Sequence, residues 1–443
     1  MRRNPFLSST LFACGLWLAT ALLPATASDA DKDRAIALAV QTLDRLDAGE
    51  YQAIVESFTP EARAAIDAES LSRIWTGLPA QLGEPTGRGE PAFNLRGALR
   101  VVVIPLHYER GMLNAIVSLD AHDRVAGLLL QPPVAAPPPR PAAAAGVRET
   151  EVHIGSGERA LPGTLSLPAP GDGLFPGVVL VHGSGPQDRD ETIGPNRPFL
   201  DIAHGLAAQG IAVLRYDKRT RARPQDYATG EYGVDDEVTL DAVTAIETLR
   251  NTPGIDPQRI YVLGHSLGAM MAPRIAARAD TAGAILFAAP SRPLLDILVE
   301  QFERMASADG TVSEAGRKAI DGLQGGIARI RAGEDVPASE APLGQSTTYW
   351  RSIEAVDPVG EAKSLAIPLL LLHGHRDIQV TDDDWRGWRD AFADDPRARL
   401  KSYPALSHLG IAGTGPGSLV DYQTAGRVDA ALIRDIVEWI GQH

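Results

Sequence analysis

The sequence predicts two folded parts: a small α+β domain, then a larger α/β domain with a mainly parallel, doubly wound sheet. The chain has 443 residues, more than one hydrophobic core of ordinary size holds. A proline-rich stretch, "QPPVAAPPPRPAAAAG", divides it, and such sequence favours an extended spacer. Beyond this stretch, strand-like apolar runs alternate with helix-like runs, which is typical of βαβ units.

Residues 1–27 are expected to be an export signal. Two arginines give a positive start, an apolar run follows, and Ala25-Thr26-Ala27 supplies the small residues that precede a cleavage site. A membrane anchor is the alternative, because the apolar run approaches the length that spans a bilayer. The only cysteine, Cys14, lies inside this segment, so a mature chain would have no disulfide. We expect a periplasmic or secreted protein with no stable membrane insertion after cleavage.

Residues 28–130 are expected to form the α+β domain, and 131–147 the linker. Apolar residues at 36, 40, 43 and 46 share one helical face, and helix-like sequence continues to about Pro79. Three β-rich runs separated by turn residues follow. Helices followed by strands suggest a small α+β unit.

Residues 148–443 contain six apolar runs that we expect to be strands of one sheet. In chain order they are "GVVLVHG", "IAVLRYD", "RIYVLGH", "GAILFAAP", "PLLLLHG" and "RLKSYP". Ligands of such sheets gather beyond the carboxyl ends of the strands. Between the fourth and fifth runs lies a long, helix-like insertion, about 291–364.

The composition limits the partners. The formal net charge is −14, and the acidic residues are scattered, which argues against a nucleic-acid or anionic-membrane surface. Neither a phosphate-binding glycine pattern nor an H-E-x-x-H zinc pattern is present, so we expect no catalytic metal. A small molecule is the expected partner, and the formation of a homo-oligomer is an open alternative.

The pentapeptide "GHSLG" is the first chemical signal. It follows the strand-like "RIYVL" and precedes the helix-competent "AMMAPRIAARA". A serine hydroxyl needs a base to become a nucleophile, and a strand–turn–helix context with flanking glycines is how a nucleophile elbow presents it. Ser266 is therefore the predicted nucleophile, although the pentapeptide alone would also suit a plain tight turn.

An acid and then a histidine should follow the nucleophile in chain order. Asp377 comes just after the run "PLLLLHG", where a loop would expose a carboxylate, and His408 lies in the loop after the next strand. The group Asp382–Asp384 competes for the role of acid, but it looks more like the capped start of a helix. The terminal His443 is a poor candidate for a positioned base.

The oxyanion of a tetrahedral intermediate needs backbone N–H donors. The residue after the nucleophile, Leu267, supplies one. The second is expected from the glycine-containing segment "HGSGPQDRDE", where we choose the amide of Ser184.

With these residues in place, the chain from about Gly146 is similar to bacterial α/β-hydrolase carboxylesterases, closest to the EstD-type esterases of the serine-aminopeptidase-like group. The resemblance rests on "VHGSGPQDRDETIGPNRPFLDIAHGLAAQGIAVLRYDKRT", "GHSLGAMMAPRIA", "LLLHGHRDIQVTDDDW" and "SHLG". It implies an α/β-hydrolase fold, the same nucleophile, acid and base, and hydrolysis of short-chain acyl esters without a cofactor. It also implies that the insertion forms a cap over the active site. We expect Tyr349 and Trp350 of this cap to line a substrate pocket; a peripheral helical hairpin is the alternative.

Before the linker, "LDAGEYQAIVESFTPEARAAI" and "LSRIWTGLPAQLGEP" resemble a domain of unknown function that precedes secreted bacterial hydrolases, which implies an accessory, binding or dimerisation role.

The leading hypothesis is an exported serine carboxylesterase that works through an acyl-enzyme. A peptidase or amidase, or a thioesterase, would use the same triad. A binding protein that retains the fold without catalysis is the alternative from another class.

Overall fold

The computed structural model describes residues 29–96, 99–131, 140, 142, 146–169, 174–227, 232–307, 312, 314–337 and 340–443. The expected export signal and most of the expected linker lie outside the described residues. Among the described helices, none combines the length and the apolar character needed to cross a bilayer.

The N-terminal domain consists of four helices followed by an antiparallel sheet. The helices are α1 (Asp29–Asp47), α2 (Tyr51–Glu56), α3 (Pro60–Ala65) and α4 (Ala68–Leu82). The strands are β1 (Pro85–Arg88), β2 (Ala92–Arg96), β3 (Leu99–Tyr108), β4 (Gly111–Leu119) and β5 (Val125–Gln131). They run in the order β1-β3-β4-β5, with β2 also pairing with β3. The apolar face of α1 packs against β3 in a core of its own, which confirms the predicted α+β unit.

The second sheet has eight strands in the order β13-β12-β11-β10-β8-β9-β7-β6. The six strands β8 to β13 are parallel, and β6 and β7 are antiparallel at one edge. The strands are β6 (Arg148–Ile154), β7 (Leu161–Leu167), β8 (Phe175–Val181), β9 (Ala212–Tyr216), β10 (Ile255–His265), β11 (Gly283–Phe287), β12 (Leu369–Gly374) and β13 (Ala398–Tyr403). All six predicted strands are present. The prediction missed β6 and β7; β6 is an edge strand whose sequence, "RETEVHI", is mostly polar.

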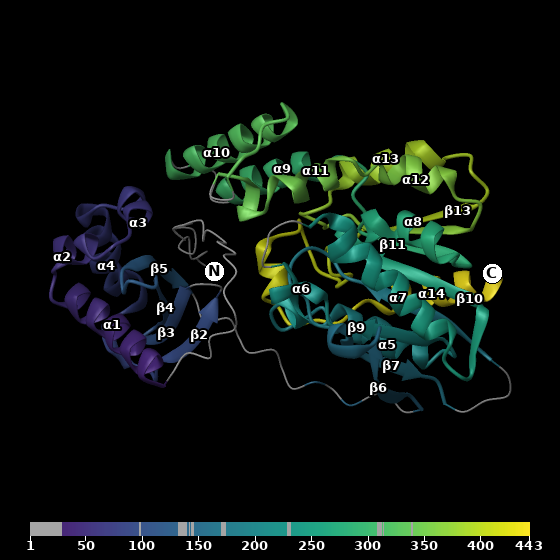
Figure 1. Ribbon diagram of the computed structural model, residues 1–443, viewed down its shortest axis with the longest axis horizontal. Coiled ribbons are helices and arrows are strands. Elements are labelled where there is room, and N and C mark those ends of the chain that lie inside the picture. The colour runs from purple at the N-terminus through teal and green to yellow at the C-terminus, as the bar shows by residue number, and fades with distance from the viewer. Residues whose placement is uncertain are drawn as a thin grey trace.

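Helices cover both faces of this sheet (Figure 1). One face packs against α5 (Pro198–Ala207) and α14 (Ala430–Gln442), and the other against α7 (Leu240–Arg250) and α8 (Leu267–Ala279). Alternate residues of β8 separate the two cores, with Val178 and Leu180 on the first side and Val179 and Val181 on the second.

The remaining elements are α6 (Arg219–Ala222), α13 (Asp382–Phe392), a π-helical turn at Asp235–Thr239, and 3₁₀ turns at Gly157–Arg159, Pro224–Tyr227, Pro342–Gly344 and Leu419–Tyr422.

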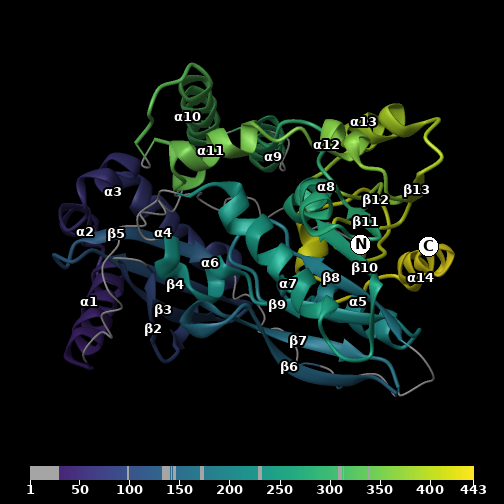
Figure 2. The same cartoon turned by 45° about the vertical axis from the view of Figure 1, so that its right-hand side comes forward.

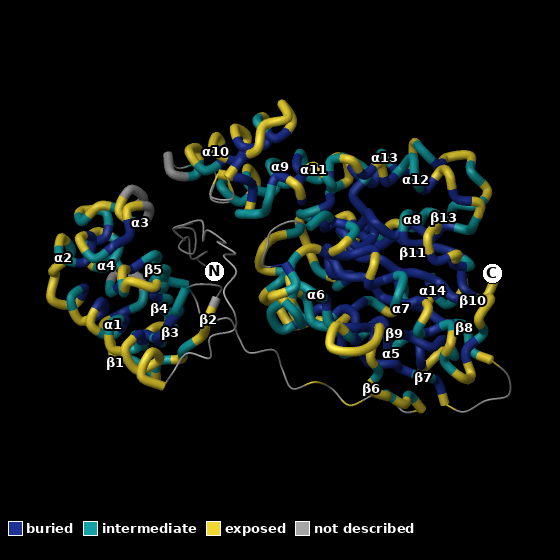
Figure 3. Tube along the Cα trace, in the orientation of Figure 1, coloured by how far each residue is buried: buried dark blue, intermediate teal, exposed yellow. Residues whose placement is uncertain are grey.

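The insertion forms a helical cap that shares the core of the α7–α8 face. It contains α9 (Leu294–Ala306), α10 (Glu314–Arg331), α11 (Thr347–Glu354) and α12 (Pro358–Ser364). Figures 1 and 2 show α9, α10 and α11 grouped together at the top of the view. Figure 3 shows α10 with a buried side and an exposed side. Leu323, Ile327, Tyr349 and Trp350 belong to the same apolar cluster as α7 and α8, so the insertion is no separate hairpin. The predicted α/β-hydrolase architecture with a helical insertion is confirmed.

Candidate active site

Ser266 stands at a sharp turn between β10 and α8. Its backbone has φ 54° and ψ −118°, a conformation that residues other than glycine rarely adopt and that costs free energy. The residues on either side, His265 and Leu267, are buried, whereas Ser266 is partly exposed. The turn therefore presents the predicted nucleophile to solvent at the carboxyl end of a central strand.

Two glycines make this turn sterically feasible. A Cβ atom on Gly264 would lie 2.1 Å from the carbonyl oxygen of Gly268, and a Cβ on Gly268 would lie 2.1 Å from that of Val181. Real side chains do not approach a backbone oxygen so closely. The glycines of "GHSLG" are thus required because the helix crosses so close to the neighbouring strands.

Asp377 and His408 lie side by side, as the predicted acid and base should. His408 Nδ1 and Asp377 Oδ2 are 2.6 Å apart, and both residues are buried. The other carboxylate oxygen of Asp377 accepts hydrogen bonds from the amides of Gln379 (2.8 Å) and Val380 (2.9 Å). The acid is thus fixed by its own loop, and one of its oxygens is left to orient the imidazole.

His265 connects the base to the nucleophile turn. Its Nε2 donates to the carbonyl oxygen of His408 at 2.9 Å, and the two rings are 4.6 Å apart between centroids. Because His265 directly precedes Ser266, this bond holds the base loop beside the elbow. Ser266 Oγ forms no hydrogen bond within the described part of the chain, and catalytic contacts of this kind often tighten only when substrate is bound.

The competing aspartates are engaged elsewhere. Asp384 is buried and bonds to the amide of Ser291 at 2.9 Å and to Arg292 at 2.8 Å. Asp383 pairs with Arg386, and Asp382 contacts His373 of β12 and His375 just after it. In the described chain, none of the three contacts His408, so the geometry favours Asp377 as the acid.

The segment after β8 passes directly over the nucleophile. A Cβ on Gly183 would lie 3.2 Å from the Cβ of Ser266. The Gly183 amide donates to Glu191 Oε1 at 2.8 Å, so it is already used. The amides of Ser184 and Leu267 form no hydrogen bond within the described residues, which leaves both predicted oxyanion donors available. Their role stays a prediction.

Glu191 and His265 form an ion pair beneath the elbow. Both are buried, and Glu191 Oε2 lies 2.9 Å from His265 Nδ1. Burial acts to raise the pKa of Glu191, but the charge of His265 outweighs it, and the pKa is lowered. Burial likewise opposes the charge on His265, but Glu191 outweighs it and raises that pKa. Within the described residues His182 forms no such ion pair, and burial lowers its pKa to about 4.

A second buried ion pair, between Lys218 and Glu237, connects Gly183 to the cap. Lys218 Nζ donates to the carbonyl oxygen of Gly183 at 2.9 Å and lies 2.7 Å from Glu237 Oε1. The Tyr349 hydroxyl of α11 donates to the other carboxylate oxygen of Glu237. All these side chains are buried, so this chain of contacts fixes the predicted oxyanion loop from the side of the cap.

Tyr349 and Trp350 are placed in the cap by hydrogen bonds as well as by apolar packing. The Tyr349 hydroxyl is used by Glu237, and Trp350 Nε1 donates to the carbonyl oxygen of Pro342 at 2.8 Å. Both side chains are buried. Their expected contribution to a substrate pocket stays a prediction.

The cap also contacts the loop that carries Asp377. From α9, Gln301 Nε2 donates to the carbonyl oxygen of Gln379 at 3.1 Å, and Arg304 donates to that of Ile378. The cap therefore contacts the Asp377 loop directly and reaches the Gly183 segment through Glu237 and Lys218.

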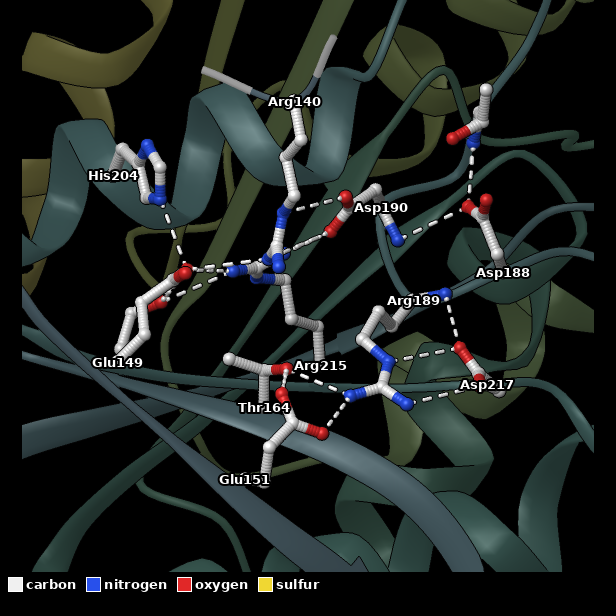
Figure 4. A network of polar contacts seen from close by, with 12 residues as sticks. Arg140, Glu149, Glu151, Thr164, Asp188, Arg189, Asp190, His204, Arg215 and Asp217 are labelled. Atoms are coloured by element: carbon white, nitrogen blue, oxygen red, sulfur yellow. Dashed lines mark hydrogen bonds and ion pairs between the residues drawn. The ribbon is translucent and has the colours of Figure 1, made fainter. Parts of the chain in front are cut away.

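Two arginines anchor the rest of the segment after Gly183 (Figure 4). Arg189 pairs with Asp217 through two contacts, of 3.0 and 3.1 Å, and also reaches Glu151 on β6 at 2.6 Å. The loop is thereby tied to β6 and to the end of β9.

The second arginine, Arg215, is fully buried between Asp190 and Glu149 and contacts both. Glu149 also accepts a hydrogen bond from His204 at 3.0 Å, and Arg140 reaches Asp190 at 3.1 Å (Figure 4). Hydrogen bonding to His204 and the charge of Arg215 outweigh burial and lower the pKa of Glu149 to about 2. Charged residues of β6 and β9 thus hold the base of the oxyanion loop.

Sequence reasoning missed Glu191, Lys218 and Glu237. The available signal was a charged residue just after a predicted strand, because such a position falls at the carboxyl edge of the sheet. Lys218 fits this rule in "YDKR", but nothing in the sequence shows that it is buried or which acid it meets.

The fold and the geometry around Ser266 define a serine hydrolase of the α/β-hydrolase type. The chain belongs to the family described as serine aminopeptidase, S33, whose profile matches residues 178–411. Residues 39–128 match a second family, a protein of unknown function called DUF3887.

Among individual proteins, the chain is similar to Esterase EstD of Thermotoga maritima. The two are 34% identical over 392 residues, which cover 88% of this chain and 91% of the relative. Among solved structures, an esterase of Pyrobaculum calidifontis is 16% identical with a TM-score of 0.43, covering 67% of this chain and 85% of its own. A puromycin-hydrolyzing peptidase of Mycobacterium tuberculosis is 19% identical with a TM-score of 0.43, covering 81% and 48%. These two similarities are too low to bear on activity.

Proposed function

We propose that the protein is an exported carboxylesterase that cleaves short-chain acyl esters through Ser266, His408 and Asp377. The observation that carries the proposal is the buried His408–Asp377 contact of 2.6 Å beside a strained serine turn. The 34% identity to an esterase over most of both chains supports the ester as substrate.

In the proposed reaction, His408 takes the proton of the Ser266 hydroxyl as its oxygen attacks the ester carbonyl. The Ser184 and Leu267 amides stabilise the oxyanion of the tetrahedral intermediate. As that intermediate collapses, the C–O bond to the alcohol breaks and His408 protonates the departing oxygen. Water then attacks the acyl-enzyme by the same route and releases the acid.

Asp377 has a separate task. It keeps His408 in the tautomer with hydrogen on Nδ1, so that Nε2 is free to accept the serine proton, and it stabilises the imidazolium. No cofactor takes part in these steps.

An aminopeptidase is the second candidate, because the family takes its name from that activity. It would need an acid free to bind the substrate's ammonium group. Two buried acids near Ser266 are already paired, Glu191 with His265 and Glu237 with Lys218. This favours the esterase.

The test is turnover of p-nitrophenyl acetate and butyrate, with aminoacyl-p-nitroanilides as the competing substrates. Ser266→Ala should lower kcat for the esters by about 10⁶-fold. The matched control Ser307→Ala, at the exposed end of α9, should retain activity. Cleavage of the anilides alone would replace the esterase with a peptidase, and inertness toward both would favour a binding protein.

Export is proposed from residues 1–27, with periplasm or medium as the destination. N-terminal sequencing of the mature protein tests it. A chain beginning at Ser28 is the expected result, and an intact N-terminus in the cytoplasm would contradict it.

A further inference from the structure

Three side chains outside the catalytic contacts bring metal-binding atoms together at the end of β12. His373 Nε2 lies 3.0 Å from Asp382 Oδ1, and His375 Nδ1 lies 2.7 Å from the same oxygen. The three atoms all lie within 4.8 Å of one another. The two imidazole nitrogens therefore approach the same carboxylate oxygen of Asp382 from different directions.

We propose that His373, His375 and Asp382 form a binding site for one divalent transition-metal ion of the zinc class. Imidazole nitrogen and carboxylate oxygen are ligands that zinc binds in tetrahedral geometry, whereas calcium and magnesium take oxygen ligands. Bonds of about 2.1 Å place the ligands of a tetrahedral ion about 3.4 Å apart. The two histidine–aspartate spacings of 2.7 and 3.0 Å are shorter than this, and a bound ion would lengthen them as it enters between three atoms that lie within 4.8 Å of one another.

The arrangement has the support that metal sites usually show. The His373 ring stacks on Trp385, with centroids 5.3 Å apart and an interplanar angle of 6°, so its orientation is fixed. The His375 ring stands at 82° to it. The His375 and Asp382 side chains are 34% and 56% exposed, so an ion can enter from solvent and keep a water molecule as its fourth ligand.

The site joins two elements across the loop that carries Asp377. His373 belongs to β12, His375 lies two residues before the acid, and Asp382 is the first residue of α13. A bound ion would connect the two ends of this loop without touching Ser266. We expect it to stabilise the folded state, because any ligand bound only by the native protein does so.

The experiment uses the full, untagged chain after treatment with a chelator and dialysis. Titration calorimetry with zinc chloride should give one saturable equivalent per chain, and magnesium chloride none. The melting temperature should rise with zinc concentration. His375→Ala and Asp382→Asn should each weaken zinc binding by more than tenfold, and the metal-free variants should fold as the wild type does, because both side chains are at the surface.

Two matched controls make the result specific. His153→Ala removes an exposed strand histidine of the same domain, and Asp383→Asn removes the neighbouring acid. Both should keep wild-type zinc affinity. The proposal is overturned if the wild type binds no zinc, if binding survives in both His375→Ala and Asp382→Asn, or if the controls lose it equally. In those cases Asp382 serves only as a hydrogen-bond acceptor at the start of α13.

Discussion

The two loops on either side of Ser266 are held in place by different means. The loop that carries Asp377 is fixed at short range, since the acid bonds to amides two and three residues further along the chain. The loop that carries Ser184 is held by buried charges on the two sides of Gly183: Glu191, eight residues along the same segment, accepts from the Gly183 amide, and Lys218, from a distant part of the chain, donates to the Gly183 carbonyl oxygen. Local backbone hydrogen bonds thus position the acid, whereas buried charges, one of them from a distant element, position the predicted oxyanion donors.

Because of this difference, we expect a substitution of Asp377 to lower kcat strongly and to leave the fold of its loop intact. Asp377→Asn should lower kcat by about 10⁴-fold, because the amide favours the wrong tautomer of His408. The backbone bonds of the loop survive, since the remaining carbonyl oxygen still accepts them. Steady-state kinetics and circular dichroism check both points.

The exposed neighbour Asp383 supplies the control for this variant. Asp383→Asn should have wild-type kinetics. Activity retained in Asp377→Asn would move the acid elsewhere.

The oxyanion loop should respond in the opposite way, with stability and catalysis falling together. Lys218→Met leaves Glu237 buried without its cation, which costs about 3–5 kcal/mol of unfolding free energy. The displaced Gly183 loop should lower kcat by up to about 100-fold with KM little changed. Chemical denaturation and ester kinetics measure the two effects.

The double variant Lys218→Met/Glu237→Gln separates these effects. Removing both charges should restore most of the stability, since no unpaired ion is left. The kcat should stay low because Gly183 still lacks its donor. A recovery of kcat together with stability would show that Lys218 acts on the fold alone.

A smaller effect is expected where the cap meets this chain of charges. Tyr349→Phe removes one hydrogen bond from the buried Glu237 and should cost about 1–3 kcal/mol. A modest fall in kcat should accompany it, because Glu237 holds Lys218. Thermal or chemical unfolding and ester kinetics test the prediction.

Tyr403→Phe is its matched control. The Tyr403 hydroxyl donates to Asp435 at 2.7 Å, a similar phenol–carboxylate bond away from the cap. This variant should lose stability but keep wild-type kcat. If both tyrosine variants lose stability and keep wild-type kcat, Tyr349 does not act on the oxyanion loop.

The smallest effect concerns pH and the charge network at the base of the oxyanion loop. The pKa of Glu149 is lowered from 4.5 to about 2 in the folded protein. A carboxyl with a lowered pKa stabilises the fold above its unfolded pKa and loses that contribution as pH falls through the folded value. Wild type should therefore exceed Glu149→Gln in stability at pH 7, and the gap should shrink between about pH 4.5 and 2.

Urea denaturation at several pH values measures this gap. Glu247→Gln, on the exposed side of α7, is the control and should show no such convergence. A gap that is constant with pH would mean that the Glu149 charge does not contribute.

The same contrast explains what could be predicted from the sequence. Six strands, the elbow and the order of Ser266, Asp377 and His408 follow from local patterns: apolar runs, flanking glycines and residues just after strand ends. The burial of Lys218, Glu237 and Glu191 depends on which distant elements meet, and composition at one position does not encode that. Of the missed strands β6 and β7, the edge strand β6 is mostly polar, so its pairing with β7, and not its own apolar content, makes it a strand.

The backbone of Ser266 has one further consequence. With φ at 54°, glycine is the residue that would suit this position best, yet glycine has no hydroxyl. Stability and chemistry therefore favour different amino acids at one site. The tight packing of α8 against β8 and β10 holds Ser266 in this conformation, and with looser packing the serine would adopt a more favourable one.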